Sequence, residues 1–260
     1  MALYTACRAR SNPPPGGIQT AHDDRDGPPS RACHTSGMPF RLDLAALTRN
    51  ELRRVLPPGQ AAVAMPALRF ARLLRRRVLA ADIYPDRIEL RVADEEEWEA
   101  LQPSAASAQG ARLFRDELAD LGFKQVGAFT TRGLPWGRNF FAYAKERDTF
   151  ASIWLADRDG PEAYVDLFSL FRAPRDGATA LLTTNQERPD PLDPSPSLWR
   201  QRFPNSSVAA LYLSHRSAML TAGVAGRRAE RVEDFAAAFL DLWNDTYQSW
   251  VARGLLKAAS

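Results

Sequence analysis

Two apolar stretches decide the fold of this chain: FASIWLA at residues 150–156 and YVDLFSLF at residues 164–171. Each has the length of a β-strand, and each is apolar on both of the faces that a strand presents. A strand of this kind lies inside a sheet whose faces are covered. We therefore expect this pair at the centre of a sheet, with helices on at least one side of it.

Three further strands are expected around this pair, near residues 124–131, 138–144 and 178–184. The connections are short and contain turn signals such as Asp159-Gly160 and Asp176-Gly177. Parallel neighbours need long crossovers, so short connections favour antiparallel pairing. The sequence thus predicts an α+β protein built on an antiparallel meander of about five strands.

Amphipathic helices are expected on both sides of this meander in the sequence. The helix before it ends at the capping residue Gly122 and carries apolar residues three or four positions apart: Ala111, Phe114, Leu118 and Leu121. Five prolines in residues 185–205 then predict an extended surface loop. Two more helices follow over residues 208–220 and 229–253, and the last has one apolar stripe: Val232, Phe235, Phe239, Leu242 and Trp250. This stripe should cap the sheet.

Residues 38–105 are predicted to form a smaller helix-hairpin-helix unit, followed by the main α+β domain over residues 106–257. Leucine spacing favours a helix over residues 40–55. A turn before alternating apolar residues at 88–92 predicts a hairpin, and residues 94–101 predict an acidic helix.

A second helix of this unit is expected from about Pro66 to Leu79. It carries one apolar stripe, with arginines facing the other way: Ala67, Phe70, Leu74 and Val78.

Residues 1–37 are predicted to be a disordered tail, because they contain almost no large aliphatic residues and nine prolines or glycines. Both cysteines lie in this tail, and their spacing with its histidines matches no compact zinc site: Cys7, His22, Cys33 and His34. The chain contains no apolar run long enough to span a membrane and no secretory leader. A cytoplasmic protein without membrane attachment, metal or cofactor is expected.

The order of the quoted segments resembles a loosely defined group of bacterial proteins of unknown function. LADLGFKQVGAF is followed by FFAYA, TFASIWLA, YVDLFSLF, a DG turn, LLTTN and a final helix ending in SWVARGLL. In that group, a helix ending in LGF precedes a strand meander that closes on a TN pair. The similarity covers about residues 111–254. It implies a fold layout and assigns no reaction.

Two residues of the predicted domain are candidates for a pocket. Asp166 interrupts the apolar face of a central strand, and a buried carboxylate needs a partner or must be neutral. His215 is the one histidine outside the tail and has a side chain suited to acid–base work. Phosphate-binding loops, a GxSxG elbow and HExxH are absent from the sequence, so no catalytic residue is assigned.

A cluster of arginines in the second helix is the candidate polyanion site: Arg69, Arg72, Arg75 and Arg76. The net charge of the chain is only +3, and stacking aromatics are not interleaved with the cluster. The favoured interpretation is therefore a non-catalytic binding or interaction module whose protein partner or small ligand is unknown. The alternatives are an enzyme or small-molecule binder with a pocket near Asp166, and nucleic-acid association through the arginine helix.

Overall fold

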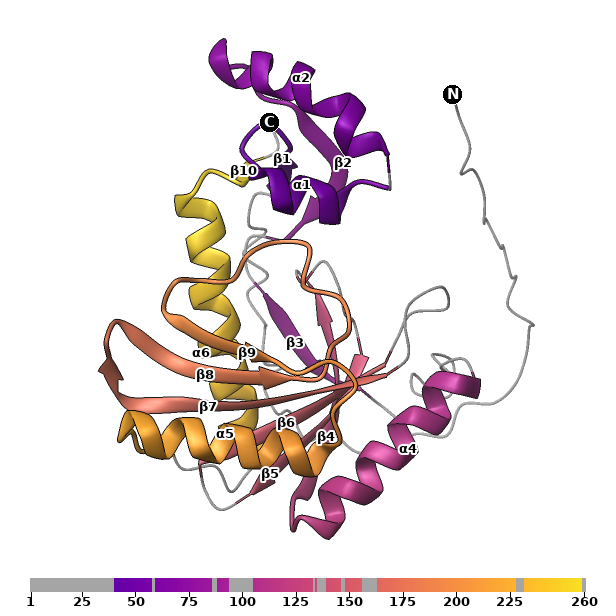
Figure 1. The fold of residues 1–260 in the computed structure, drawn as a ribbon, viewed down its shortest axis with the longest axis vertical. Coiled ribbons are helices and arrows are strands. Elements are labelled where there is room, and N and C mark those ends of the chain that lie inside the picture. Colours follow the sequence, from indigo (N-terminus) through magenta and orange to yellow (C-terminus); the bar gives the residue numbers. More distant parts are fainter. Residues whose placement is uncertain are drawn as a thin grey trace, which may run out of the picture. The chain divides into compact units, whose positions relative to one another are not determined.

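The predicted meander forms the centre of a seven-stranded sheet in the computed structural model of the protein (Figure 1). The structure describes residues 40–57, 59–85, 88–93, 105–132, 134, 139–145, 148–155, 163–227 and 232–258. The expected strands are β4 (Lys124–Arg132), β5 (Asn139–Lys145), β6 (Thr149–Trp154), β7 (Tyr164–Arg175) and β8 (Ala178–Thr184), each antiparallel to the next. The α+β fold is confirmed. The predicted tail over residues 1–37 and the predicted acidic helix over residues 94–101 lie outside the described residues.

Two edge strands enlarge the sheet beyond the expected five. β3 (Glu89–Val92) pairs antiparallel with β4, and β9 (Leu198–Arg202) runs parallel to β8. The strand order β3-β4-β5-β6-β7-β8-β9 places β6 in the middle with β7 beside it, as predicted. β9 lies in the segment where a loop was predicted. Its pairing is compatible with the nearby prolines because residues 197–203 contain none, and every backbone N–H there can donate.

Helices cover both faces of the large sheet. α6 (Val232–Ala252) packs on one face, where Phe239 lies 4.9 Å from Phe140 and Phe235 lies 5.4 Å from Phe129, measured between ring centroids. α4 (Ala105–Asp120) and α5 (Val208–Ala222) pack on the other face. The described part of the predicted final stripe is therefore buried against the sheet, which explains why β6 and β7 are apolar on both sides.

The N-terminal elements build a second, smaller sheet. β1 (Phe40–Asp43) lies between β2 (Leu79–Tyr84) and the C-terminal strand β10 (Leu256–Ala258). The expected hairpin is not formed, because β2 joins this small sheet while β3 joins the large one. The pairing of β1 with β10 joins the two ends of the described chain, which a local sequence pattern cannot indicate.

Two short helices connect β1 to β2. The predicted helix over residues 40–55 is in fact β1 followed by α1 (Arg49–Val55). α1 starts there because the Thr48 hydroxyl accepts from the Glu51 N–H at 3.2 Å and the Glu51 carboxylate accepts from the Thr48 N–H at 2.9 Å. α2 (Gln60–Leu73) follows, beginning six residues before the predicted start at Pro66. No helix among the described residues is long and apolar enough to cross a membrane.

Candidate functional site

Asp166 lies near the start of β7, on the sheet face that α6 covers. The strand register places it between Ser152 of β6 and Thr184 of β8, and its side chain is 4% exposed. One carboxylate oxygen, Oδ2, accepts a hydrogen bond from Trp154 Nε1 at 2.8 Å. The other, Oδ1, makes no hydrogen bond within the described part of the chain.

The surroundings of Asp166 raise the pKa of its carboxyl to about 7. Burial is the largest cause, because a desolvated carboxylate is less stable than the neutral acid. The Thr184 hydroxyl and the charge of Arg200 act in the opposite direction, whereas the charge of Asp190 raises the pKa further. Arg200 is held by Asp190 at 2.6 Å and by the Gln186 side chain at 2.9 Å.

Three other buried polar atoms close to Asp166 lack hydrogen bonds among the described residues: Ser152 Oγ, Tyr164 Oη and Arg200 Nε. With Asp166 Oδ1 they form a cluster that contains a carboxyl titrating near neutral pH. Such a group can hold or release a proton. The Arg200 side chain is 16% exposed, but Asp166 is only 4% and Tyr164 9% exposed, so the carboxyl itself is closed off from solvent. A substrate could reach it only if the packing of sheet and helix opened.

His215 lies on α5 and is fully buried against the opposite face of the sheet. Its Nε2 is 3.0 Å from Ser169 Oγ, and its Nδ1 is 3.0 Å from Thr183 Oγ1. The Ser169 hydroxyl donates to the Asp148 carbonyl at 2.6 Å, so the serine oxygen accepts from the imidazole N–H. In the tautomer that this network assigns, Nε2 carries the hydrogen, and Nδ1 accepts a hydrogen bond from the Thr183 hydroxyl.

This arrangement differs from the serine–histidine pair of a hydrolase. In a hydrolase the nucleophilic serine donates its hydrogen bond to the imidazole, whereas the Ser169 hydroxyl donates its hydrogen bond to the Asp148 carbonyl. Burial, followed by the charge of Arg216, lowers the pKa of His215 to about 3, so the ring is neutral. The histidine network holds α5 on β7 and β8.

The structure therefore does not bring the two predicted pocket residues together. Asp166 faces α6 on one side of the sheet, and His215 projects from α5 onto the other side, where it bonds Ser169 and Thr183. Nor do three or more His, Cys, Asp or Glu side chains gather as metal ligands anywhere in the described ranges.

The predicted arginine cluster divides into one structural residue and several unpaired ones. Arg72 Nε donates to the Ala45 carbonyl and Arg72 Nη2 to the Leu47 carbonyl, both at 2.6 Å. These bonds fix the loop between β1 and α1, so Arg72 is not available to bind a polyanion. Among the described residues, the side chains of Arg69, Arg75 and Arg76 make no hydrogen bond or ion pair, and all three are exposed.

Phe70 and Leu74 of the predicted apolar stripe face solvent, whereas Val78 lies beyond the end of α2 and packs against the core. Together with two exposed apolar residues that were not in that stripe, they form what we call the α2 apolar face: Val63 (82% exposed), Phe70 (62%), Leu73 (78%) and Leu74 (47%). Intervals of seven and eleven residues are about two and three helical turns, so Val63, Phe70 and Leu74 lie in one line. The opposite side of the helix is buried through Ala61 and Leu68. The sequence of α2 is apolar on two sides of the helix, and this pattern could have indicated an exposed apolar surface. Periodicity alone does not indicate which of the two sides is covered.

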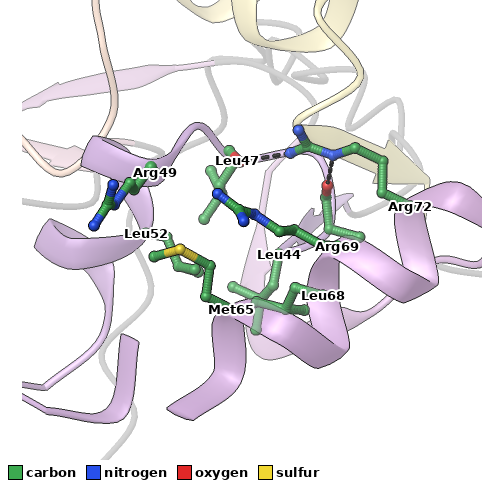
Figure 2. Close-up of a pocket in the computed structure, with 9 residues that line it drawn as sticks. Leu44, Leu47, Arg49, Leu52, Met65, Leu68, Arg69 and Arg72 are labelled. Atoms are coloured by element: carbon green, nitrogen blue, oxygen red, sulfur yellow. Dashed lines mark hydrogen bonds between the residues drawn. The ribbon is translucent and has the colours of Figure 1, made fainter. Parts of the chain in front are cut away.

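A cavity of about 120 Å³ lies between α1 and α2 (Figure 2). Its wall is formed by aliphatic side chains, and arginines from both helices border it: Leu44, Leu47, Leu52, Met65, Leu68, Arg49, Arg69 and Arg72. No sequence pattern indicates this cavity, because it depends on how α1 and α2 pack together.

Comparison of the chain with protein families, with curated proteins and with solved structures finds no match.

Proposed function

We propose that this protein is a non-catalytic binding module that docks an acidic amphipathic helix of a partner protein on the α2 apolar face. The observation that carries the proposal is the exposure of four large apolar side chains on one side of a single helix. Isolated exposed apolar residues are ordinary, but a contiguous group of them is typical of an interaction surface. An amphipathic helix binds such a surface through side chains at intervals of three, four and seven.

The charges beside the α2 apolar face favour an acidic partner. Arg69 lies along one edge of the face, and Arg75, Arg76 and Arg77 follow the end of α2. All four are exposed, and none of their side chains has a hydrogen-bonding or ionic partner among the described residues. Carboxylates on the partner would pair with these guanidinium groups and fix the orientation in which its helix binds.

The same charges argue against other occupants. A second copy of this chain would bring the arginines of both faces together, and like charges repel. Nucleic acid would contact the arginines but leave Phe70 and Leu73 uncovered. A bilayer surrounds an embedded helix with headgroups on both flanks, whereas the other flank of α2 carries no charged residue, only Gln60, Ala64, Ala67 and Ala71.

Site-specific crosslinking tests the proposal in the cell that makes the protein. The photoreactive p-benzoylphenylalanine replaces Phe70, and a matched control carries it at Leu213, which is 69% exposed on α5. We expect crosslinks from position 70 to a protein segment that is acidic and amphipathic, and none to that segment from position 213. The corresponding synthetic peptide should bind the full chain and should lose at least tenfold in affinity for Phe70→Asp.

Three results would overturn the proposal. They are crosslinks from position 70 to a second copy of the chain, crosslinks to lipid or nucleic acid, and equal crosslinking from both positions. If the captured peptide binds Phe70→Asp as tightly as the unchanged chain, the α2 apolar face is not the docking surface. A cooperative unfolding transition of Phe70→Asp verifies that the variant is folded; the change lies on the surface, so little loss of stability is expected.

A further inference from the structure

We infer that the cavity between α1 and α2 is a binding site for a small aliphatic carboxylate, with its chain in the cavity and its carboxylate on Arg49 and Arg69. The apolar part of this site is separate from the α2 apolar face, because Met65 and Leu68 project from the other side of α2, and only Arg69 borders both. The site combines an apolar wall with cations at its border, which is the arrangement that an amphiphilic anion requires.

The size of the cavity sets the length of the chain that it can hold. An apolar protein cavity of roughly 150 Å³ holds a molecule of benzene, which has six carbons. The cavity here is about 120 Å³ and is lined by Leu44, Leu47, Leu52, Met65 and Leu68. It therefore accommodates about four or five carbons. Water in such a space would find few partners among these side chains, so an aliphatic chain can displace it favourably.

The two arginines set the charge of the ligand. Arg49 projects from α1 and Arg69 from α2, and Figure 2 shows both side chains beside the apolar residues of the cavity. Both are exposed, and neither makes an ion pair or side-chain hydrogen bond with the described residues. Guanidinium groups bind carboxylates through paired N–H donors, so an anion between the helices would satisfy donors that are otherwise left to solvent.

Arg72 has a different role in the same site. Its guanidinium is already bonded to the carbonyls of Ala45 and Leu47, and the dashed lines in Figure 2 mark these bonds. The wall formed by the β1–α1 loop is therefore held in place before a ligand arrives. A preformed wall reduces the ordering cost of binding.

Pentanoate is the probe for this site, and methionine methyl groups are the reporters. The full chain is labelled at its methionine methyls and titrated with pentanoate by NMR. Met65 lines the cavity, whereas Met219 lies in a separate core cluster and serves as an internal control. We expect a saturable shift of the Met65 signal and none of the Met219 signal. Pentan-1-ol lacks the charge and acetate lacks the chain, so both should bind at least tenfold more weakly.

Variants distinguish the site from nonspecific binding. Arg49→Gln and Arg69→Gln should each weaken pentanoate binding about tenfold. Arg53→Gln is the matched control, because Arg53 is also exposed on α1 but does not line the cavity, and it should leave the affinity unchanged. Met65→Trp should fill the cavity and abolish pentanoate binding. Because this variant lacks the Met65 reporter, its binding is measured by calorimetry.

The inference is overturned if pentan-1-ol binds as well as pentanoate, if Arg69→Gln and Arg53→Gln behave alike, or if the Met65 signal shows no saturable shift. Each of these results leaves the proposed docking on the α2 apolar face untouched, because that surface is tested at Phe70.

Discussion

Replacing Asp166 with asparagine should make the protein more stable at alkaline pH and should remove part of the pH dependence of its stability. Asparagine has nearly the same shape and cannot ionise, and its amide oxygen can still accept the hydrogen bond from Trp154. The substitution therefore isolates the cost of the buried negative charge.

The size of the effect follows from the pKa of Asp166. Burial is the main cause that raises this pKa from 3.8 to about 7 in the folded protein. Because the pKa of Asp166 is higher in the folded than in the unfolded protein, protonation of this carboxyl favours the folded state. This contribution to the free energy of unfolding is fully present below about pH 4 and is lost as the pH rises through about 7. Between about pH 5 and pH 8.5, linkage from this one carboxyl removes about 3 kcal/mol of the free energy of unfolding.

Urea unfolding at about pH 5 and pH 8.5 measures the effect. The free energy of unfolding of Asp166→Asn minus that of the unchanged chain should increase by about 3 kcal/mol over this range. Contributions from other titrating groups cancel in this difference. Asp176→Asn is the matched control, because Asp176 is exposed in the β7–β8 turn and asparagine tolerates its positive φ of 51°. A difference that stays within about 1 kcal/mol would refute the argument that Asp166 is desolvated.

Two further predictions concern His215 and Arg75. The His215 ring should remain neutral from pH 8 down to about pH 4 in an NMR titration, since burial lowers its pKa to about 3; a midpoint near pH 6 would contradict the Ser169–His215–Thr183 network. Arg75 lies just after the end of α2 with a positive φ of 54°, so Arg75→Gly should raise the free energy of unfolding by about 1 kcal/mol. Arg75→Gly should also weaken binding of the partner peptide, because it removes one of the guanidinium groups proposed to pair with the peptide. A variant that is less stable than the unchanged chain and binds the peptide equally well would contradict both roles of Arg75.

The sequence predicted the centre of the fold well, because the deciding information there is local. The five strands of the meander, α4, α5 and α6 follow from apolar patterns and short turns within single segments. The N-terminal part was predicted less well. β1 is a strand because Phe40 pairs with Ala258 at the far end of the chain, and no pattern within residues 40–55 encodes that partner. β9 was predicted to be part of a loop because the segment around it is rich in proline, although five consecutive residues within that segment can pair as a strand.

The candidate sites were harder to predict because their properties depend on what lies next to each side chain. Asp166 was expected to need a partner, and the structure provides Trp154 for only one of its oxygens. The stripe containing Phe70 and Leu74 was recognised from its spacing, but its exposure depends on which side of α2 meets α1 and the small sheet. Arg69 and Arg72 are alike in sequence, yet only Arg72 is within reach of two loop carbonyls.

The anchoring of α1 explains how a short helix can provide a firm wall for the cavity. Glu51 is fully buried on α1 and accepts from the Thr48 and Asp193 N–H groups and from Arg253 at 2.7 Å. Burial alone would raise the pKa of Glu51, but these hydrogen bonds outweigh it and lower the pKa. The carboxylate therefore remains charged at neutral pH and ties α1 to the end of α6 and to the loop before β9. Because α1 is fixed in this way, Arg49 and Leu52 are held opposite α2 before any ligand binds, and the binding energy need not be spent on ordering the helix.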